Sequence, residues 1–143
     1  MSQVINNQRK VELDSGVFQS FLEKMFAAVP GISGRSATVA FISDRRMKEL
    51  NNFFRGKNST TDVLSFPHEA DIFADDDDKE FLGDIVISAE QAARQAKENG
   101  LTLENEIEQL ILHGILHLCG YDHETDEGEM NAMELKLRKK LGI

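Results

Sequence analysis

The chain has 143 residues, a formal net charge of −9, one cysteine and four histidines, and 41% of its residues are hydrophobic. This length fits one domain over residues 1–143, and the hydrophobic fraction suffices for a core. A lone Cys119 forms no intrachain disulfide, and the negative charge argues against a protein that coats nucleic acid by bulk attraction. The sequence has neither a signal-peptide pattern at its start nor a run of the about 18 apolar residues that cross a membrane, so we expect a cytoplasmic protein without a membrane partner.

Short strands and helices alternate in the first half of the chain. Apolar residues recur at helical spacing or gather in β-branched and aromatic runs, which indicates the type of each element. We expect, in chain order, an edge strand over Val4–Val11, a helix over Ser15–Val29, a strand over Ala37–Ile42, and a helix that Ser43 or Asp44 caps and whose apolar face holds Met47, Leu50 and Phe54.

The second half is expected to contain a polar loop, two strands and three helices. This order is typical of an α+β domain with a mixed sheet of about four strands, one of them antiparallel, packed with about five helices. Gly100 ends the first of the three helices, and Asp126 and Glu129 have the spacing of a capping box before the last. The expected ranges are a loop over Arg55–Thr61, strands over Val63–Phe66 and Leu82–Ser88, and helices over Ala89–Asn99, Leu103–Cys119 and about Glu127–Leu141.

Three of the four histidines lie within eleven residues, in the sequence H-G-I-L-H-L-C-G-Y-D-H at 113–123. His113 and His117 are four residues apart on a predicted helix, so their rings project from one face, one turn apart. Gly120 indicates a left-handed turn that would bring His123 back as a third ligand. Three histidines leave one tetrahedral position open, as in catalytic zinc sites. The pattern therefore predicts a zincin-like metal helix in a metal-dependent hydrolase, with Zn²⁺ as the expected ion and Ni²⁺, Co²⁺ or Cu²⁺ as alternatives.

The same histidine spacing occurs in metzincin peptidases, H-E-x-x-H-x-x-G-x-x-H, in which the glutamate is the general base. Gly114 stands at the position of that glutamate. A peptidase would lack its base, so the pattern indicates a shared ligand geometry and a different reaction. The fourth histidine, His68, is expected at the surface, and Cys119 is expected to be a small core residue.

Basic residues stand in the polar loop before the strand at 63–66. Arg55 and Lys57 lie there, and a guanidinium suits bidentate pairing with a phosphate better than an ammonium does. Taken alone, the loop is more typical of an ordinary solvated turn.

Three motifs together resemble the signatures of the YbeY family, which are bacterial single-strand-specific endoribonucleases and ribosomal RNA maturation factors. They are H-G-I-L-H-L-C-G-Y-D-H at 113–123, T-D-V-L-S-F-P at 61–67 and L-G-D-I-V-I at 82–87. Their order and spacing agree from about Leu50 to His123. Asn58 and Thr60 depart from the family pattern, which has aspartate and proline there. Both residues lie in the loop, so these departures bear on the rigidity of the loop more than on its chemistry.

The resemblance implies a zinc-type metal on His113, His117 and His123, and it implies that Arg55 is needed for activity. We accordingly take Arg55 and His113 as the catalytic residues. The implied substrate is single-stranded RNA, in particular small-subunit ribosomal RNA and its 3′ end, and the implied partners are the small ribosomal subunit or its proteins. A role in ribosome quality control is implied as well.

Phosphodiester hydrolysis at such a site leaves the general base and the nucleophile open. Asp122 is one candidate base, although it would more readily orient a ligand ring, and Asp62 and Asp84 would equally cap turns or hold Arg55. Tyr121 is expected to pack beneath the site. The nucleophile is either water or the 2′-hydroxyl of the RNA, which the product ends would distinguish.

Aromatic side chains for stacking unpaired bases are available at Phe53, Phe54 and Phe66, but we expect each of them in the core. Two alternatives to the ribonuclease stay open. One is a non-catalytic ribosome-assembly factor in which the metal only clamps the last two helices. The other is a metallopeptidase that takes its carboxylate from elsewhere in the chain.

Overall fold

The computed structural model describes residues 2–69, 73, 80–121 and 127–143. These residues form an α+β fold of four strands and five helices, as the sequence predicts. The elements are β1 (Gln3–Asn6), α1 (Ser15–Ala28), β2 (Ser36–Ile42), α2 (Asp44–Arg55), β3 (Val63–Pro67), β4 (Phe81–Ser88), α4 (Ala89–Asn99), α5 (Leu103–Leu118) and α6 (Glu129–Leu141).

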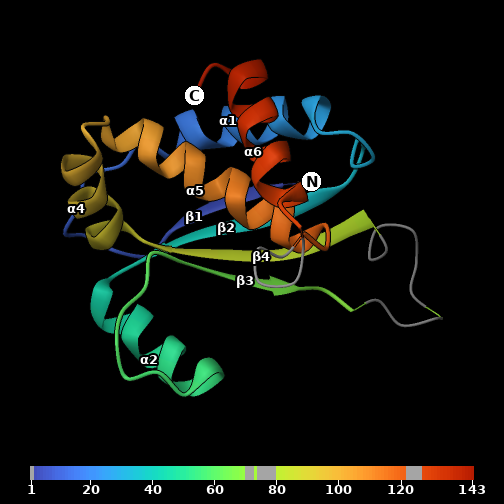
Figure 1. The fold of residues 1–143 in the computed structure, drawn as a ribbon. Coiled ribbons are helices and arrows are strands. Elements are labelled where there is room, and N and C mark those ends of the chain that lie inside the picture. Colours follow the sequence, from blue (N-terminus) through green and yellow to red (C-terminus); the bar gives the residue numbers. More distant parts are fainter. Residues whose placement is uncertain (1, 70–72, 74–79, 122–126) are drawn as a thin grey trace.

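The four strands form one mixed sheet in the order β1-β2-β4-β3. β1 pairs with β2 and β2 with β4 in parallel, whereas β3 pairs with β4 antiparallel. Helices α1, α4, α5 and α6 lie on one side of this sheet, and α2 lies on the other (Figure 1). Both β1 and β3 are edge strands, so the edge position predicted for the first strand is confirmed.

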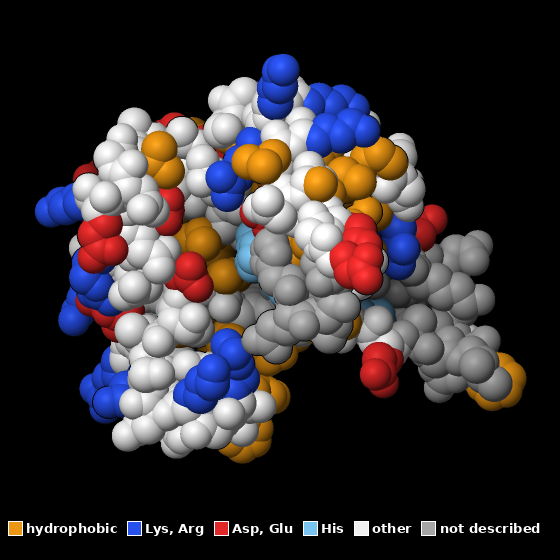
Figure 2. All heavy atoms as spheres, in the orientation of Figure 1, with side chains coloured by type: hydrophobic (Ala, Val, Ile, Leu, Met, Phe, Trp, Pro, Cys, Tyr) orange, Lys and Arg blue, Asp and Glu red, His pale blue; other side chains and the backbone are white. Residues whose placement is uncertain are grey.

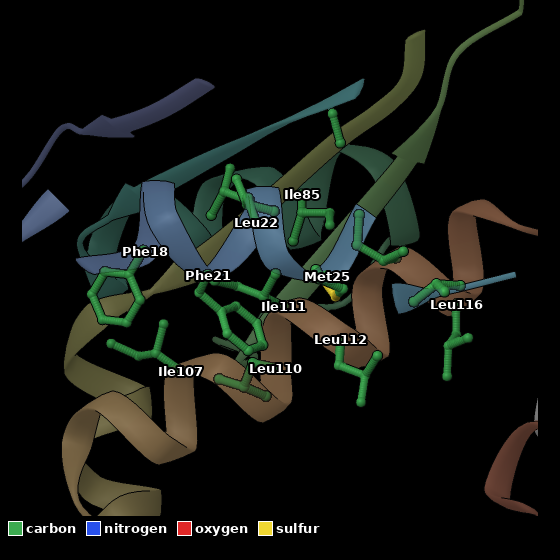
Figure 3. Packing of buried hydrophobic residues seen from close by; sticks show 14 of the residues in the cluster. Phe18, Phe21, Leu22, Met25, Ile85, Ile107, Leu110, Ile111, Leu112 and Leu116 are labelled. Atoms are coloured by element: carbon green, nitrogen blue, oxygen red, sulfur yellow. The ribbon is translucent and has the colours of Figure 1, made fainter. Parts of the chain in front are cut away.

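The main core lies between the sheet and the helices that cover it. Ile85 and Ile87 of β4 are fully buried on this face, together with Ile111 and Ile115 of α5. Figure 3 shows side chains of α1, among them Phe21 and Met25, next to Ile111 of α5 in the core that also contains Ile85. A smaller cluster of Ile42, Met47 and Leu64 fills the opposite face under α2. The side chains of β3 and β4 therefore alternate between the α5 face and the α2 face.

Two predicted boundaries differ from the structure by two residues or more. The first strand ends at Asn6 rather than near Val11, because the Gln8 side chain bonds both the N–H and the carbonyl of Val11 and closes a turn there. The last helix begins at Glu129 with Gly128 as its N-cap, not at Glu127. Asp126, the other half of the predicted capping box, lies outside the described residues.

The expected core positions of two phenylalanines are also wrong. Phe53 is 81% exposed and Phe54 is 57% exposed. The inner face of α2 is occupied by Met47 and Asn51, both buried. Phe53 and Phe54 lie outside this inner face, and Phe54 contacts the ring of Phe66 of β3.

Within the described ranges, we find no helix that is both long enough and apolar enough to cross a membrane.

Candidate active site

Helix α5 carries the core on one face and the candidate site on another. The Thr102 hydroxyl begins the helix by accepting a hydrogen bond from the N–H of Asn105 at 3.1 Å. The helix ends at Leu118, and Gly120 has a φ of 97°, a conformation that glycine adopts without a steric penalty. The left-handed turn predicted after the histidine helix is therefore present.

His113 and His117 face each other on α5. Their ring centroids are 4.6 Å apart with an interplanar angle of 74°, and their Nε2 atoms are 3.0 Å apart. The side chain of His113 is 29% exposed, so the pair is reachable from the surface. The predicted projection of both rings from one face of the helix is confirmed.

Glu134 of α6 forms a hydrogen bond with the Nδ1 atom of His113. Its Oε1 atom lies 2.6 Å from His113 Nδ1, and its side chain is 9% exposed. A carboxylate at Nδ1 favours the tautomer that carries the proton there, which leaves the Nε2 lone pair directed at His117. The remaining Glu134 oxygen, Oε2, is 3.5 Å from Nη2 of Arg138.

Glu134 and Arg138 were not found by sequence reasoning. Their signal is weak, because a glutamate and an arginine four residues apart are common on helix surfaces. What makes Glu134 unusual is its burial against a histidine 21 positions away, and this becomes visible once α6 is placed against α5.

The residues present fit a transition metal. Two imidazole nitrogens at 2.0–2.1 Å from a tetrahedral ion would be about 3.3 Å apart, close to the observed 3.0 Å between the two Nε2 atoms. A buried carboxylate on the far nitrogen of a ligating histidine is the usual way to orient such a ring. His123, the predicted third ligand, lies outside the described residues, and so does Asp122. The ligand set therefore stays a prediction.

Gly114 contacts the sheet at the position where a metzincin has its glutamate. A Cβ built on it would lie 3.0 Å from both Cδ1 and Cγ2 of Ile85, which is fully buried. A longer side chain at position 114 would have to displace core residues of β4. The glycine is thus a packing requirement.

A pocket of about 390 Å³ lies beside His113. Asp62, at the start of β3, and Glu106, of α5, contribute carboxylates to it, and Arg138 contributes a guanidinium. With its amide oriented to donate, Gln95 lies 3.1 Å from Glu106 and 3.2 Å from Oδ2 of Asp62. The other oxygen of Asp62 accepts the N–H of Val63 at 2.8 Å. Both Asp62 oxygens are therefore engaged, which favours a turn-capping role over that of a general base.

Arg55 is the last residue of α2 and is exposed, so it belongs to a helix end and not to the loop that the sequence predicted. Gly56, in the left-handed conformation, ends the helix directly after it. Because α2 covers the sheet face opposite α5, the structure does not bring Arg55 into the pocket that contains His113 (Figure 1). Its catalytic role stays a prediction.

The other singled-out residues lie where expected or outside the site. Tyr121 packs against the core, and His68 is exposed. Cys119 is partly buried against the core, and burial raises the pKa of its thiol although Arg35 acts in the opposite direction. Asp84 is exposed and alternates with the inward-facing Ile85, which places it on the α2 face, away from the histidines.

Comparison with known families adds to this geometry. Residues 3–142 match the family model described as Endoribonuclease YbeY. The chain belongs to the YbeY family. The match covers His113, His117, Glu134 and the strands of the sheet. It confirms the resemblance that the motifs indicate.

Individual YbeY relatives cover almost the whole chain. A protein named Endoribonuclease YbeY from Thermodesulfovibrio yellowstonii is 36% identical over 152 residues, 97% of this chain and 93% of its own length. One of the same name from Carboxydothermus hydrogenoformans is 38% identical over 147 residues, covering 100% and 99%. The solution structure of TM1509 from Thermotoga maritima superposes with a TM-score of 0.66 at 30% identity, over 99% of this chain and 89% of that one.

Proposed function

We propose that this protein is a metal-dependent endoribonuclease that cleaves single-stranded RNA at the histidines of α5. The observation that carries the proposal is the convergence of His113 Nε2 and His117 Nε2 at 3.0 Å, with Glu134 on the far nitrogen of His113. Membership of the YbeY family supports the reaction class.

Each residue of the site has a chemical role in this proposal. His113, His117 and His123 would hold the ion, for which zinc is the first choice, and Glu134 keeps the His113 ring in a ligating orientation. When bound, such an ion supplies Lewis acidity toward a phosphoryl oxygen. Arg55 would pair with a phosphate of the same RNA strand, since a guanidinium presents two parallel donors to phosphate oxygens.

The decisive experiment is cleavage of an end-labelled single-stranded RNA by the purified protein, compared with His117→Ala and Arg55→Ala. We expect the histidine variant to lose cleavage and Arg55→Ala to lose most of it. His68→Ala and Arg45→Ala are matched controls, because His68 is an exposed histidine and Arg45 is an exposed arginine at the other end of α2. Equal cleavage by wild type and His117→Ala would show that a contaminating nuclease acts and would overturn the proposal.

A lysine at position 55 separates charge from geometry. Arg55→Lys keeps the positive charge but cannot form the bidentate pair, so we expect activity between wild type and Arg55→Ala. If Arg55→Ala cleaves as fast as wild type, the arginine has no role in the reaction. The histidine site is tested separately by His117→Ala.

The non-catalytic alternative also finds some support in the link between α5 and α6. The Glu134–His113 contact already joins these helices, and a metal beside it would stiffen the junction. A chelator would then lower the melting temperature of the protein, and RNA cleavage would be absent in the metal-loaded state. The peptidase alternative needs a carboxylate from elsewhere in the chain, because Ile85 closes position 114 to a glutamate; cleavage of peptides without cleavage of RNA would favour it.

The biological substrate is proposed to be small-subunit ribosomal RNA, including its 3′ end, with the small subunit or its proteins as partners in the cytoplasm and with a part in ribosome quality control. The net charge of −9 supports docking through a partner, because bulk attraction to RNA is weak for such a chain. Mapping 16S-type RNA ends in cells that lack the protein tests this. Unaltered 3′ ends would contradict it.

A further inference from the structure

Three phenyl rings form a continuous exposed cluster outside the histidine site. Phe53 and Phe54 of α2 are 4.8 Å apart between ring centroids, and Phe54 is 4.9 Å from Phe66 of β3. Both contacts are edge-to-face, at 77° and 63°. We refer to these three residues as the phenyl cluster.

It is unusual for adjoining phenylalanine side chains to be exposed together. Single exposed apolar residues are normal, whereas adjoining large ones mark surfaces that meet a ligand or partner. Phe53 and Phe54 are 81% and 57% exposed, and Phe66 is partly buried against the small cluster under α2. Phe66 thus anchors the group, while two rings present open faces.

The helix that carries Phe53 and Phe54, together with the residues directly after it, is positively charged on a negative chain. Residues 44–58 hold five basic and two acidic side chains, a formal charge of +3 against −9 for the whole protein. Arg55 and Lys57, directly after Phe54, are both exposed. Figure 2 shows hydrophobic and basic side chains next to each other at the lower end of the molecule, where α2 lies. This combination complements a ligand with flat apolar groups and negative charges.

We propose that the phenyl cluster is a stacking platform for unpaired nucleobases, with Arg55 and Lys57 binding the phosphates of the same strand. The inference rests on the proposed function and names how the substrate is held. Every base has a π-face, so such a platform tolerates any sequence, while paired bases cannot reach it. It would supply the preference for single strands without any contact at the histidines.

The position of the phenyl cluster suits a strand that passes over the sheet edge. Phe66 pairs in register with Asp84, so the two side chains share the α2 face. A carboxylate disfavours phosphate there, and the phosphates are therefore expected at the Arg55 end. β3 is one of the two edge strands of the sheet, and Val63 at its start lines the pocket beside His113. One strand of the sheet thus separates the platform from the candidate catalytic pocket.

The chain has no tryptophan, which makes a direct optical test available. Phe53→Trp places one fluorophore in the cluster, and a second change, His117→Ala, stops cleavage during titration. The probes are a single-stranded oligoadenylate of about ten nucleotides, the same strand paired with its complement, and an abasic strand with the same phosphates. We expect quenching by the first and little by the other two.

Binding of the same oligoadenylate to tryptophan-free variants gives the second measurement, by anisotropy of a labelled strand. Phe53→Leu with Phe54→Leu keeps apolar side chains but removes the rings, and we expect Kd to rise about tenfold or more. Leu135→Ala, an equally exposed apolar position on α6, should leave Kd unchanged. Circular dichroism and the melting temperature verify that each variant is folded.

The outcomes separate this inference from the proposed function. Quenching by the abasic strand, or an unchanged Kd in the leucine variant, would overturn the platform, and cleavage by the histidine-intact protein would still support the endoribonuclease. Base-dependent quenching without any cleavage would support the platform and contradict the enzyme. Self-association that the leucine variant abolishes, with no effect of RNA, would assign the cluster to a second copy of the chain.

Discussion

Glu134 of α6 binds Nδ1 of His113 on α5 at 2.6 Å, while Nε2 of the same ring faces His117 at 3.0 Å. One carboxylate therefore sets both the orientation of the histidine and the nitrogen that is available to a metal. The contact also ties the last helix to the site, so α6 belongs to the active region although it carries no predicted ligand.

Replacing Glu134 should weaken metal binding. In Glu134→Ala the His113 ring loses its restraint, and we expect metal affinity to fall about 10–100-fold. Competition with a colorimetric chelator measures this without relying on activity. Glu134→Gln keeps an acceptor for Nδ1–H and should recover part of the loss, which a merely structural role would not require. The exposed Glu129→Ala on the same helix should behave like wild type, and an equal affinity in Glu134→Ala would contradict the positioning role.

Gly114→Ala should destabilise the fold despite alanine's better helix propensity. The propensity gain is about 1 kcal/mol, whereas forcing a methyl group into a filled core costs about 1–3 kcal/mol. Because the new Cβ would lie 3.0 Å from two atoms of the fully buried Ile85, we expect a net loss of about 1 kcal/mol. Urea denaturation measures it. In a double-mutant cycle, Ile85→Val should offset part of the loss, since it removes the Cδ1 atom. A Gly114→Ala variant that is more stable than wild type would show that β4 shifts to make room for the methyl group, and would contradict the prediction.

Asp44 should make stability depend on pH. Burial would raise the pKa of its carboxyl, but hydrogen bonds from Ser88, Arg94 and Thr60 and the charge of Arg94 outweigh burial and lower the pKa. The folded pKa is below the unfolded one, so the stabilisation is complete above about pH 5 and is lost as the pH falls through the folded value. Asp44→Asn should therefore lose about 1–2 kcal/mol near neutral pH and progressively less below about pH 4.

Denaturation of both proteins across this pH range checks the sign. The Arg94 contact joins α2 to α4 through a 2.6 Å ion pair, and the Ser88 hydroxyl donates to Asp44 at 2.6 Å. The exposed Asp14→Asn serves as a comparison for a carboxylate that only caps a helix. A difference between wild type and Asp44→Asn that grows on acidification would contradict the assignment.

Asn51 should control the loop that follows Arg55. Its buried side chain donates from Nδ2 to the carbonyl of Ser59 at 2.8 Å, which ties α2 to the loop. Asn51→Ala should destabilise the protein by about 1–2 kcal/mol and, because the loop loses its tether, should speed tryptic cleavage after the already exposed Lys57. Limited proteolysis under native conditions measures the rate. The adjacent Asn52→Ala, at an exposed position, should be cut like wild type, and equal rates in both variants would contradict the role of Asn51.

Local periodicity accounts for what the sequence predicted well. The spacing of His113 and His117 determines their shared helix face, and Gly100 and Gly120 mark turns that occur as expected. Such features depend on residues within one or two turns of each other. The helix ranges and the two strands of the hairpin follow for the same reason.

Contacts between distant segments account for what the sequence did not predict. Glu134 becomes part of the site through the packing of α6 on α5, and neither helix carries a sign of this contact. Phe53 and Phe54 are exposed because the face of α2 that packs on the sheet carries Met47 and Asn51 instead. Apolarity alone indicates that a ring would gain from burial, but burial also needs a surface opposite it, and the tertiary arrangement decides whether one exists.

Helix α5 contributes to the core and also carries the candidate site, which has a consequence for thermal unfolding. Ile111 and Ile115 lie in the innermost core, and His113 stands between them in the same helical turn. His113 cannot leave its position by local fraying while the core holds, because any loss of the helix at this turn is also a loss of the core. Displacement of His113 and global melting should therefore share a single midpoint.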